Sequence, residues 1–224
     1  MKLTQVKGNT WVLEGFELIP LYRLENNTCI LLDTGLKDER EDIENSLLEA
    51  GLTPAGILCS HAHIDHAGNN RYFQEKYHIP VALTAREAGM CASILSLKCY
   101  FLLLPPDMVE RESSNLVHTP DVIIPDQDGS FSFAGAEFTI LHTPGHSKGS
   151  VTLKVGDVLF TGDTLFQGSM GRTDFAGGSY EEIMASLKRL GQLPGDCHVL
   201  PGHMGTSSLE AERRSNYYMQ EAMG

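Results

Sequence analysis

The sequence has few of the features that mark a membrane protein or a secreted, disulfide-rich protein. No uninterrupted apolar run reaches the roughly 18 residues that a membrane-spanning helix needs, and the N-terminal residues 1–5 have no apolar stretch typical of a secretory signal. The five cysteines are odd in number and none forms a CxxC pair. They are therefore expected to be reduced thiols, and the expected location is cytoplasmic, without membrane contact.

Positive charge is also scarce. The 17 lysines and arginines stand against 29 aspartates and glutamates, which gives a formal net charge of −12 at pH 7. A chain with this balance repels phosphate backbones, so no nucleic-acid partner is expected. The length of 224 residues and the hydrophobic fraction of 42% are ordinary for one globular domain. Because no motif repeat or linker divides the chain, we expect a single domain over residues 1–224.

The apolar pattern predicts strands, helices, strands and helices, in that order. Strands are predicted at 16–23, 28–32, 55–59, 81–84 and 198–200, hairpins at 130–141 and 150–161, and helices at 37–50, 66–77, 180–190 and 208–219. The segment around 90–128 fits neither period well and is interpreted as an atypical excursion. Two half-domains that pack sheet against sheet would produce this order, so the predicted class is α/β.

The most distinctive feature is the sequence HAHIDH at residues 61–66, directly after the predicted strand at 55–59. By composition alone, a chance HxHxDH pattern in such a chain has odds of about one in a thousand. Four metal-binding groups on one short loop cannot all reach one small ion, and their spacing sends His61 and His63 to one side and Asp65 and His66 to the other. Two adjacent metals are therefore predicted, and these ligand types suit zinc, iron or manganese.

A single loop supplies only part of two coordination spheres, so further ligands must come from elsewhere. His142, Asp163 and His203 each come at or just after the end of a predicted strand, beside glycines or prolines that turn the chain sharply. A side chain in such a place can project from the sheet edge toward a shared site. The four remaining histidines are assigned to ordinary structure: His78, His118, His146 and His198. Of these, His146 lies near the expected site.

The motifs HxHxDH, HTPGHSxGS, LFTGDTLF, GRTDF and PGH occur in this order between about Asp33 and His203. As a set they resemble the metallo-β-lactamase superfamily, and most of all the bacterial single-domain glyoxalase II-like hydrolases. The resemblance implies a four-layer αββα sandwich with a dinuclear metal site. These motifs are specific for the fold and the metals, and much less specific for the substrate.

The resemblance also implies a role for each candidate residue. Seven metal ligands are implied. The first metal would be bound by His61, His63 and His142, and the second by Asp65, His66 and His203. Asp163 would bridge the two metals. A hydroxide shared by the metals and oriented by Asp65 would attack a carbonyl that the metals polarise. Zinc is the favoured metal, with iron or manganese as alternatives. Asp33 would orient a ligand histidine, although capping of the adjacent turn is an equal interpretation.

The activity implied by the resemblance is hydrolysis of a thioester such as S-lactoylglutathione, or of a related acyl ester. The expected partner is a small-molecule acyl substrate, with a monomer and a homodimer both open. One alternative is a mononuclear iron persulfide dioxygenase, which shares the fold and the GRTDF segment but needs only two histidines and one aspartate on its iron. Another is a metal-binding protein of this fold without activity. Retention of all the implied ligands favours the hydrolase, and Arg172 and Asp174 are assigned a structural, internal bond.

Overall fold

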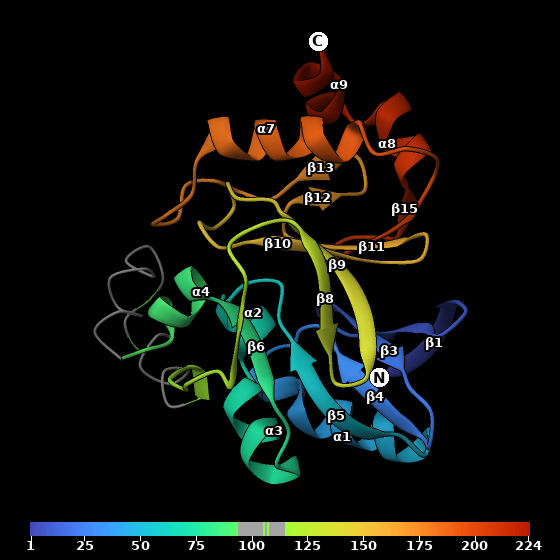
Figure 1. Cartoon of the computed structure of the whole chain (residues 1–224), viewed down its shortest axis with the longest axis vertical. Helices are drawn as coiled ribbons and strands as arrows, with labels where there is room; N and C mark the ends of the chain where they lie inside the picture. Colours follow the sequence, from blue (N-terminus) through green and yellow to red (C-terminus); the bar gives the residue numbers. More distant parts are fainter. Residues whose placement is uncertain (94–104, 106, 108–114) are drawn as a thin grey trace.

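Two β-sheets lie face to face in the computed structural model, and helices cover the outer face of each sheet (Figure 1). One helical layer contains α1 (Arg40–Glu49) and α3 (Asn70–Tyr77). The opposite layer contains α7 (Tyr180–Gly191), α8 (Leu209–Ser215) and α9 (Tyr217–Met223). This arrangement is a four-layer αββα sandwich, so the predicted fold class is confirmed.

The N-terminal sheet has seven strands that follow one another in sequence order. They are β1 (Lys2–Lys7), β2 (Thr10–Glu14), β3 (Leu18–Arg23), β4 (Thr28–Leu31), β5 (Thr53–Leu58), β6 (Val81–Thr84) and β7 (Val122–Ile124). Strands β4 to β7 run parallel. Helix α1 carries the chain back across the sheet between β4 and β5, and α3 does so between β5 and β6. Strands β4 and β5 therefore end at the same edge, which brings Asp33 close to the loop that starts at His61.

The C-terminal sheet has six strands in the order β15-β14-β11-β10-β9-β8. They are β8 (Gly129–Phe133), β9 (Ala136–His142), β10 (Val151–Val155), β11 (Val158–Gly162), β14 (His198–Pro201) and β15 (Ser207–Ser208). Both β9 and β11 are antiparallel to β10, and β14 is parallel to β11. The chain therefore leaves β9, β11 and β14 at one edge of the sheet, where the loops with His146, Asp163 and His203 begin.

The main hydrophobic core lies between the two sheets. Ile30 and Leu58 of the N-terminal sheet pack in one cluster with Phe138, Leu153 and Phe160 of the C-terminal sheet, and all five are at most 2% exposed. Each such side chain contributes about 1.5–3 kcal/mol when it leaves water. This core fixes the distance between the sheets, and with it the distance between the loops at their edges.

The structure describes residues 1–93, 105, 107 and 115–224, so much of the expected excursion at 90–128 lies outside the described residues. Within that excursion β7 adds a strand that the sequence pattern did not indicate, and β1 and β2 were also not expected. The predicted helix at 208–219 is two helices, because Asn216 is extended (φ −78°, ψ 111°) and its side chain caps α9. No described helix has the length and hydropathy needed to cross a bilayer.

Candidate metal centre

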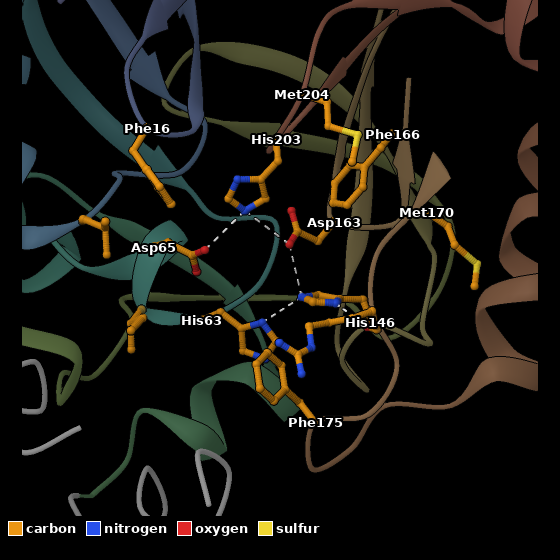
Figure 2. Close-up of a pocket in the computed structure, with 13 residues that line it drawn as sticks. Phe16, His63, Asp65, His146, Asp163, Phe166, Met170, Phe175, His203 and Met204 are labelled. Atoms are coloured by element: carbon orange, nitrogen blue, oxygen red, sulfur yellow. Dashed lines mark hydrogen bonds and ion pairs between the residues drawn. The ribbon is translucent and has the colours of Figure 1, made fainter. Parts of the chain in front are cut away.

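Loops from both sheets meet at one edge of the sandwich and bring histidine and aspartate side chains together (Figure 2). One loop follows β5 and continues into the short helix α2 (Ile64–Ala67), and the others follow β9, β11 and β14. The side chains that gather there are His61, His63, Asp65, His66, His146, Asp163 and His203. Six of the seven expected ligands are therefore in one place, and one expected ligand is replaced by another histidine.

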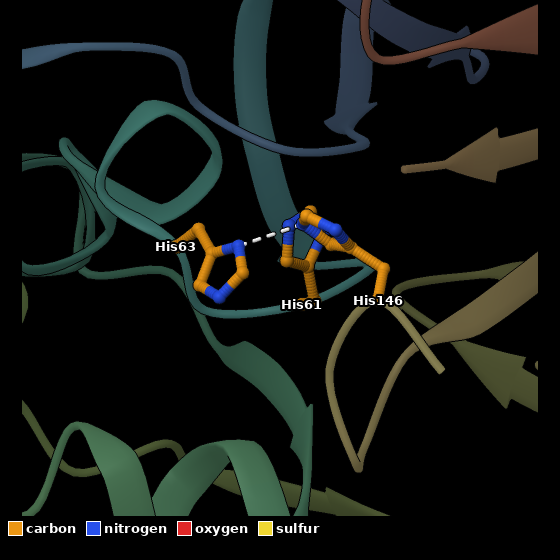
Figure 3. Close-up of side chains that lie close together, drawn as sticks. All are labelled: His61, His63 and His146. Carbon is orange, nitrogen blue, oxygen red and sulfur yellow. Dashed lines mark hydrogen bonds between the residues drawn. The ribbon is translucent and has the colours of Figure 1, made fainter. Parts of the chain in front are cut away.

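His61, His63 and His146 form a first group, drawn in Figure 3. Their ligand atoms lie within 4.8 Å of one another, and His63 Nδ1 is 2.8 Å from His146 Nε2. The His61 ring is edge-on to the other two, with centroid distances of 4.6 Å and 4.9 Å. All three side chains are at most 4% exposed. Three imidazoles that face one point form a donor set typical of a zinc or iron site.

The structure places His142 outside this group, which corrects the expectation that His142 is a ligand. His142 is the last residue of β9 and is still paired with Val151 of β10. Its Nε2 donates to the Pro125 carbonyl at 2.9 Å, and its Nδ1 lies 3.8 Å from a carboxylate oxygen of Asp126. A side chain held in the sheet in this way cannot reach the cluster, so the prediction for His142 is wrong.

His146, which was assigned to ordinary structure, takes that place. The chain turns at Gly145, whose φ of +132° favours glycine, and a Cβ there would lie 2.2 Å from the Ile183 backbone nitrogen in α7. His146 Nδ1 then donates to the Arg172 carbonyl at 2.7 Å. Because a carbonyl only accepts, the proton is on Nδ1 and the lone pair of Nε2 points into the cluster. The available sequence signal was that the HTPGHS motif holds a second histidine beyond the strand.

Asp65, His66 and His203 form a second group, and Asp163 lies between the two groups. His203 Nε2 is 3.2 Å from Asp65 Oδ2 and 3.6 Å from Asp163 Oδ2. On its other side, Asp163 Oδ2 is 3.4 Å from His146 Nε2, while Asp163 Oδ1 is 3.2 Å from His66 Nε2. A carboxylate in contact with both groups has the geometry that a bridging ligand requires.

Unpaired atoms at the centre show whether the residues fit metal ions. His61 Nε2, His66 Nε2 and Asp163 Oδ1 are buried and make no hydrogen bond with any residue that the structure describes. Two of them, His66 Nε2 and Asp163 Oδ1, lie 3.2 Å apart without a hydrogen bond of good geometry. A buried polar atom that lacks a hydrogen bond costs about 1–3 kcal/mol, so the three atoms together need a common explanation. Two divalent cations would bind all three, and imidazole and carboxylate ligands suit such cations. The donor set therefore fits a dinuclear site.

The electrostatics divide the cluster in two. Burial lowers the pKa of His63 to about 3, with a further contribution from His146, and burial likewise lowers the pKa of His61 well below its usual value. Around His66, burial lowers the pKa, but the charges of Asp163, Asp65 and Asp33 outweigh it and raise the pKa well above its usual value. The first group is thus held as neutral imidazoles, the form that binds metal, and the second is surrounded by negative charge.

Asp33 lies directly behind His66. Its Oδ2 is 2.8 Å from His66 Nδ1 and accepts from Ser60 Oγ at 2.7 Å, while its Oδ1 accepts from the Ser60 amide at 2.7 Å. A carboxylate at Nδ1 holds a proton there, which leaves Nε2, the atom that faces Asp163, as the ring nitrogen that a divalent cation would bind. Asp33 also has a φ of +72°, an uncommon conformation that is concentrated at functional sites. These contacts favour the interpretation of Asp33 as the residue that orients a ligand histidine.

Sequence reasoning missed Glu87 in α4 (Ala85–Met90). Its side chain is 2% exposed. One carboxylate oxygen accepts from the Ala62 amide at 2.8 Å, and the other accepts from Ser147 Oγ at 2.7 Å and the Gly149 amide at 2.8 Å. Glu87 thus joins the loop of the first two histidines to the loop that follows His146. No pattern in the sequence pointed to it, because its three partners are distant along the chain.

A pocket of about 560 Å³ opens over the cluster and is shown in Figure 2. Arg172 lines it and forms the internal bond to Asp174 that the sequence predicted, with two nitrogen–oxygen distances of 2.6 Å. The Arg172 guanidinium also lies 4.1 Å from the centre of the Phe175 ring. The GRTDF segment therefore forms part of the pocket wall, with its charges paired.

Comparison with known proteins agrees with this geometry. Residues 7–203 match the family model described as "Metallo-beta-lactamase superfamily". The "Probable metallo-hydrolase YqgX" of Bacillus subtilis is 33% identical over 201 residues, 88% of this chain and 90% of the relative. The "Hydroxyacylglutathione hydrolase GloC" of Haemophilus influenzae is 30% identical over 218 residues, 91% of this chain and 97% of the relative. A solved structure, TTHA1623 in a di-iron-bound form, has a TM-score of 0.72 at 31% identity and covers 92% of this chain and 98% of that chain.

Proposed function

Because the chain belongs to the metallo-β-lactamase superfamily, whose matched relatives include metallo-hydrolases, we propose that it is a two-metal hydrolase of a small acyl substrate. The substrate class is a thioester of the S-lactoylglutathione kind or a related acyl ester. The observation that carries the proposal is the pair of ligand groups that share Asp163, with three buried atoms left without hydrogen bonds. The relative named as a hydroxyacylglutathione hydrolase supports the thioester class.

The proposed ligands follow the positions in the structure. We assign His61, His63 and His146 to one cation, Asp65, His66 and His203 to the other, and Asp163 to both. Bound divalent cations would polarise the substrate carbonyl and lower the pKa of a water that they bind. Zinc is the proposed metal, and iron is the main competitor because a 31% identical relative has been solved with two irons. Manganese suits the same ligand types.

The side chains of the pocket floor have distinct tasks in this proposal. Asp65 lines the pocket and its side chain is 25% exposed. Burial raises its pKa, but the charge of His66 and a hydrogen bond from His203 outweigh this and hold the pKa below its usual value. Asp65 is therefore ionised and can accept a hydrogen bond from the attacking water. Asp33 and Glu87 do not line the pocket, and they hold the ligand loops in place.

Elemental analysis combined with an activity assay tests the proposal. The purified protein should contain two divalent cations per chain and release thiol from S-lactoylglutathione or a simpler acyl thioester. A chelator should abolish the activity, and added zinc should restore it. Two tightly bound cations with no turnover of any thioester or ester would favour a binding protein instead. Oxygen consumption with glutathione persulfide would favour the persulfide dioxygenase.

A further inference from the structure

The walls of the pocket differ sharply from its floor. The floor consists of the proposed metal ligands, whereas the walls are almost entirely apolar (Figure 2). The apolar lining residues are Phe16, Leu36, Ile64, Phe166, Met170, Phe175 and Met204. A volume of about 560 Å³ lies in the range of small-molecule sites and exceeds the space that a two-carbon acyl group needs. The shape and chemistry of the walls therefore contain information about the substrate.

Two of these apolar residues are strongly exposed. Phe16, between β2 and β3, is 73% exposed and Met204, after β14, is 58% exposed. Both lie beside the metal ligand His203, since the rings of Phe16 and His203 are 6.1 Å apart and Met204 is the next residue in the chain. Met204 also has a φ of +68°, a strained conformation for a side chain of this kind. Large exposed apolar side chains around a pocket are typical of a binding surface.

The charged residues that line the pocket also favour an uncharged substrate. Apart from the histidines, Arg172 is the only cation among the described lining residues, and Asp174 pairs with it. The other charged lining residues are Asp65 and Asp163. Glutathione carries two carboxylates, which need unpaired cations or amide donors on the protein. Among the residues described in the pocket walls, no unpaired cation meets that need.

We propose that this pocket selects thioesters or esters whose apolar acyl group is longer than acetyl, and that it disfavours an anionic leaving group such as glutathione. This inference rests on the proposed hydrolase function and narrows its substrate class. In the reaction, water oxygen bonds to the acyl carbon, the carbon–sulfur or carbon–oxygen bond breaks, and the leaving group takes a proton. The products are an apolar carboxylate, a free thiol or alcohol, and one proton that the carboxylic acid releases to solvent. No oxidant or reductant is required.

Four thioesters test the proposal in the metal-loaded protein: acetyl and hexanoyl groups, each on N-acetylcysteamine, which is uncharged, and on glutathione. Burial of one methylene contributes about a fourfold gain in kcat/KM when it is complete. With partial burial of four methylenes, we expect hexanoyl to exceed acetyl by about tenfold or more on N-acetylcysteamine. We also expect each N-acetylcysteamine thioester to exceed its glutathione counterpart.

Variants at the pocket rim test whether Phe16 and Met204 cause the preference for the longer acyl group. Phe16→Ser and Met204→Ser should lower kcat/KM for the hexanoyl thioester by about tenfold and for the acetyl thioester much less. Both side chains are exposed, so neither substitution removes core packing. Leu48→Ser is the matched control, because Leu48 is 77% exposed on α1 and does not line the pocket. It should leave both values unchanged.

The outcomes separate this inference from the function on which it rests. Equal rates for acetyl and hexanoyl thioesters, or a preference for the glutathione forms, would overturn the inference while the hydrolase stands. No cleavage of any of the four thioesters or of the matching p-nitrophenyl esters would overturn the hydrolase function itself. An unchanged chain-length preference in Phe16→Ser and Met204→Ser would refute the assignment to these residues.

Discussion

Replacement of Asp33 by asparagine should disturb the metal-facing atom of His66 without disturbing the backbone. Asparagine tolerates positive φ about as well as aspartate, so the φ of +72° is not an obstacle. In the native protein the carboxylate keeps a proton on His66 Nδ1, 2.8 Å away. An amide nitrogen in that position would donate to Nδ1 and move the proton to Nε2. Nε2 faces Asp163 at 3.2 Å, and a metal ion would have to displace that proton in order to bind there.

The magnitude follows from the two orientations that the amide can take. In the other orientation the amide nitrogen of the new asparagine faces the Ser60 amide, which in the native protein donates to Asp33 Oδ1 at 2.7 Å. Two donors then face each other, and a buried donor without an acceptor costs about 1–3 kcal/mol. Loss of the partner that orients a ligand histidine typically weakens metal binding about 10- to 100-fold. That range corresponds to about 1.4–2.7 kcal/mol, and we expect it for the metal held by His66.

The assay is competition for zinc with a chromophoric chelator, together with metal stoichiometry by elemental analysis. Asp33→Asn should lose one zinc at chelator concentrations at which the native protein keeps two. Asp38→Asn is the control, because it removes the same charge from an exposed residue nearby and should behave as the native protein does. Native affinity for both zinc ions in a folded Asp33→Asn variant would refute the argument from the tautomer of His66.

Further substitutions test the ligand assignment and the charge of a buried acid. His146→Ala should reduce the metal content by about one ion per chain and abolish hydrolysis, whereas His142→Ala should keep two ions; the reverse pattern by elemental analysis would reinstate His142. Asp163→Ala should weaken both metals together, and loss of only one ion would contradict a bridging position. Burial and the charges of Glu39 and Asp65 raise the pKa of Glu17 to about 9, so the folded protein keeps a proton that the unfolded chain loses above its pKa of about 4.5. Stability should therefore fall between about pH 4.5 and pH 9, and Glu17→Gln should remove part of this fall, up to about 3 kcal/mol at pH 7. Urea unfolding at pH 5, 7 and 9 checks this expectation, and identical pH dependence in both proteins would show that Glu17 is not protonated in the fold.

The sequence alone determined which chemical groups are present and which elements carry them. Alternating and helical apolar periods are local properties of the chain, so most of the strands and the helices that cover them could be predicted. The HxHxDH loop indicated a metal site on composition and spacing, before any partner was known. Asp163 and His203 could be added because each lies just after a predicted strand, beside glycines, and because the resemblance of the motifs implies both as ligands.

Tertiary structure alone decided between His142 and His146, which lie four residues apart in one motif. The choice depends on how far β9 stays paired with β10 and on a turn at Gly145 that packs against Ile183 in α7. Glu87 became visible only in the fold for the same reason, since its hydrogen bonds join Ala62 to Gly149. Contacts of this kind depend on distances between loops, and the packing of two sheets across a common core sets those distances. The spacing of residues along the chain indicates which side chains are candidate ligands, but it does not determine the direction in which each side chain points.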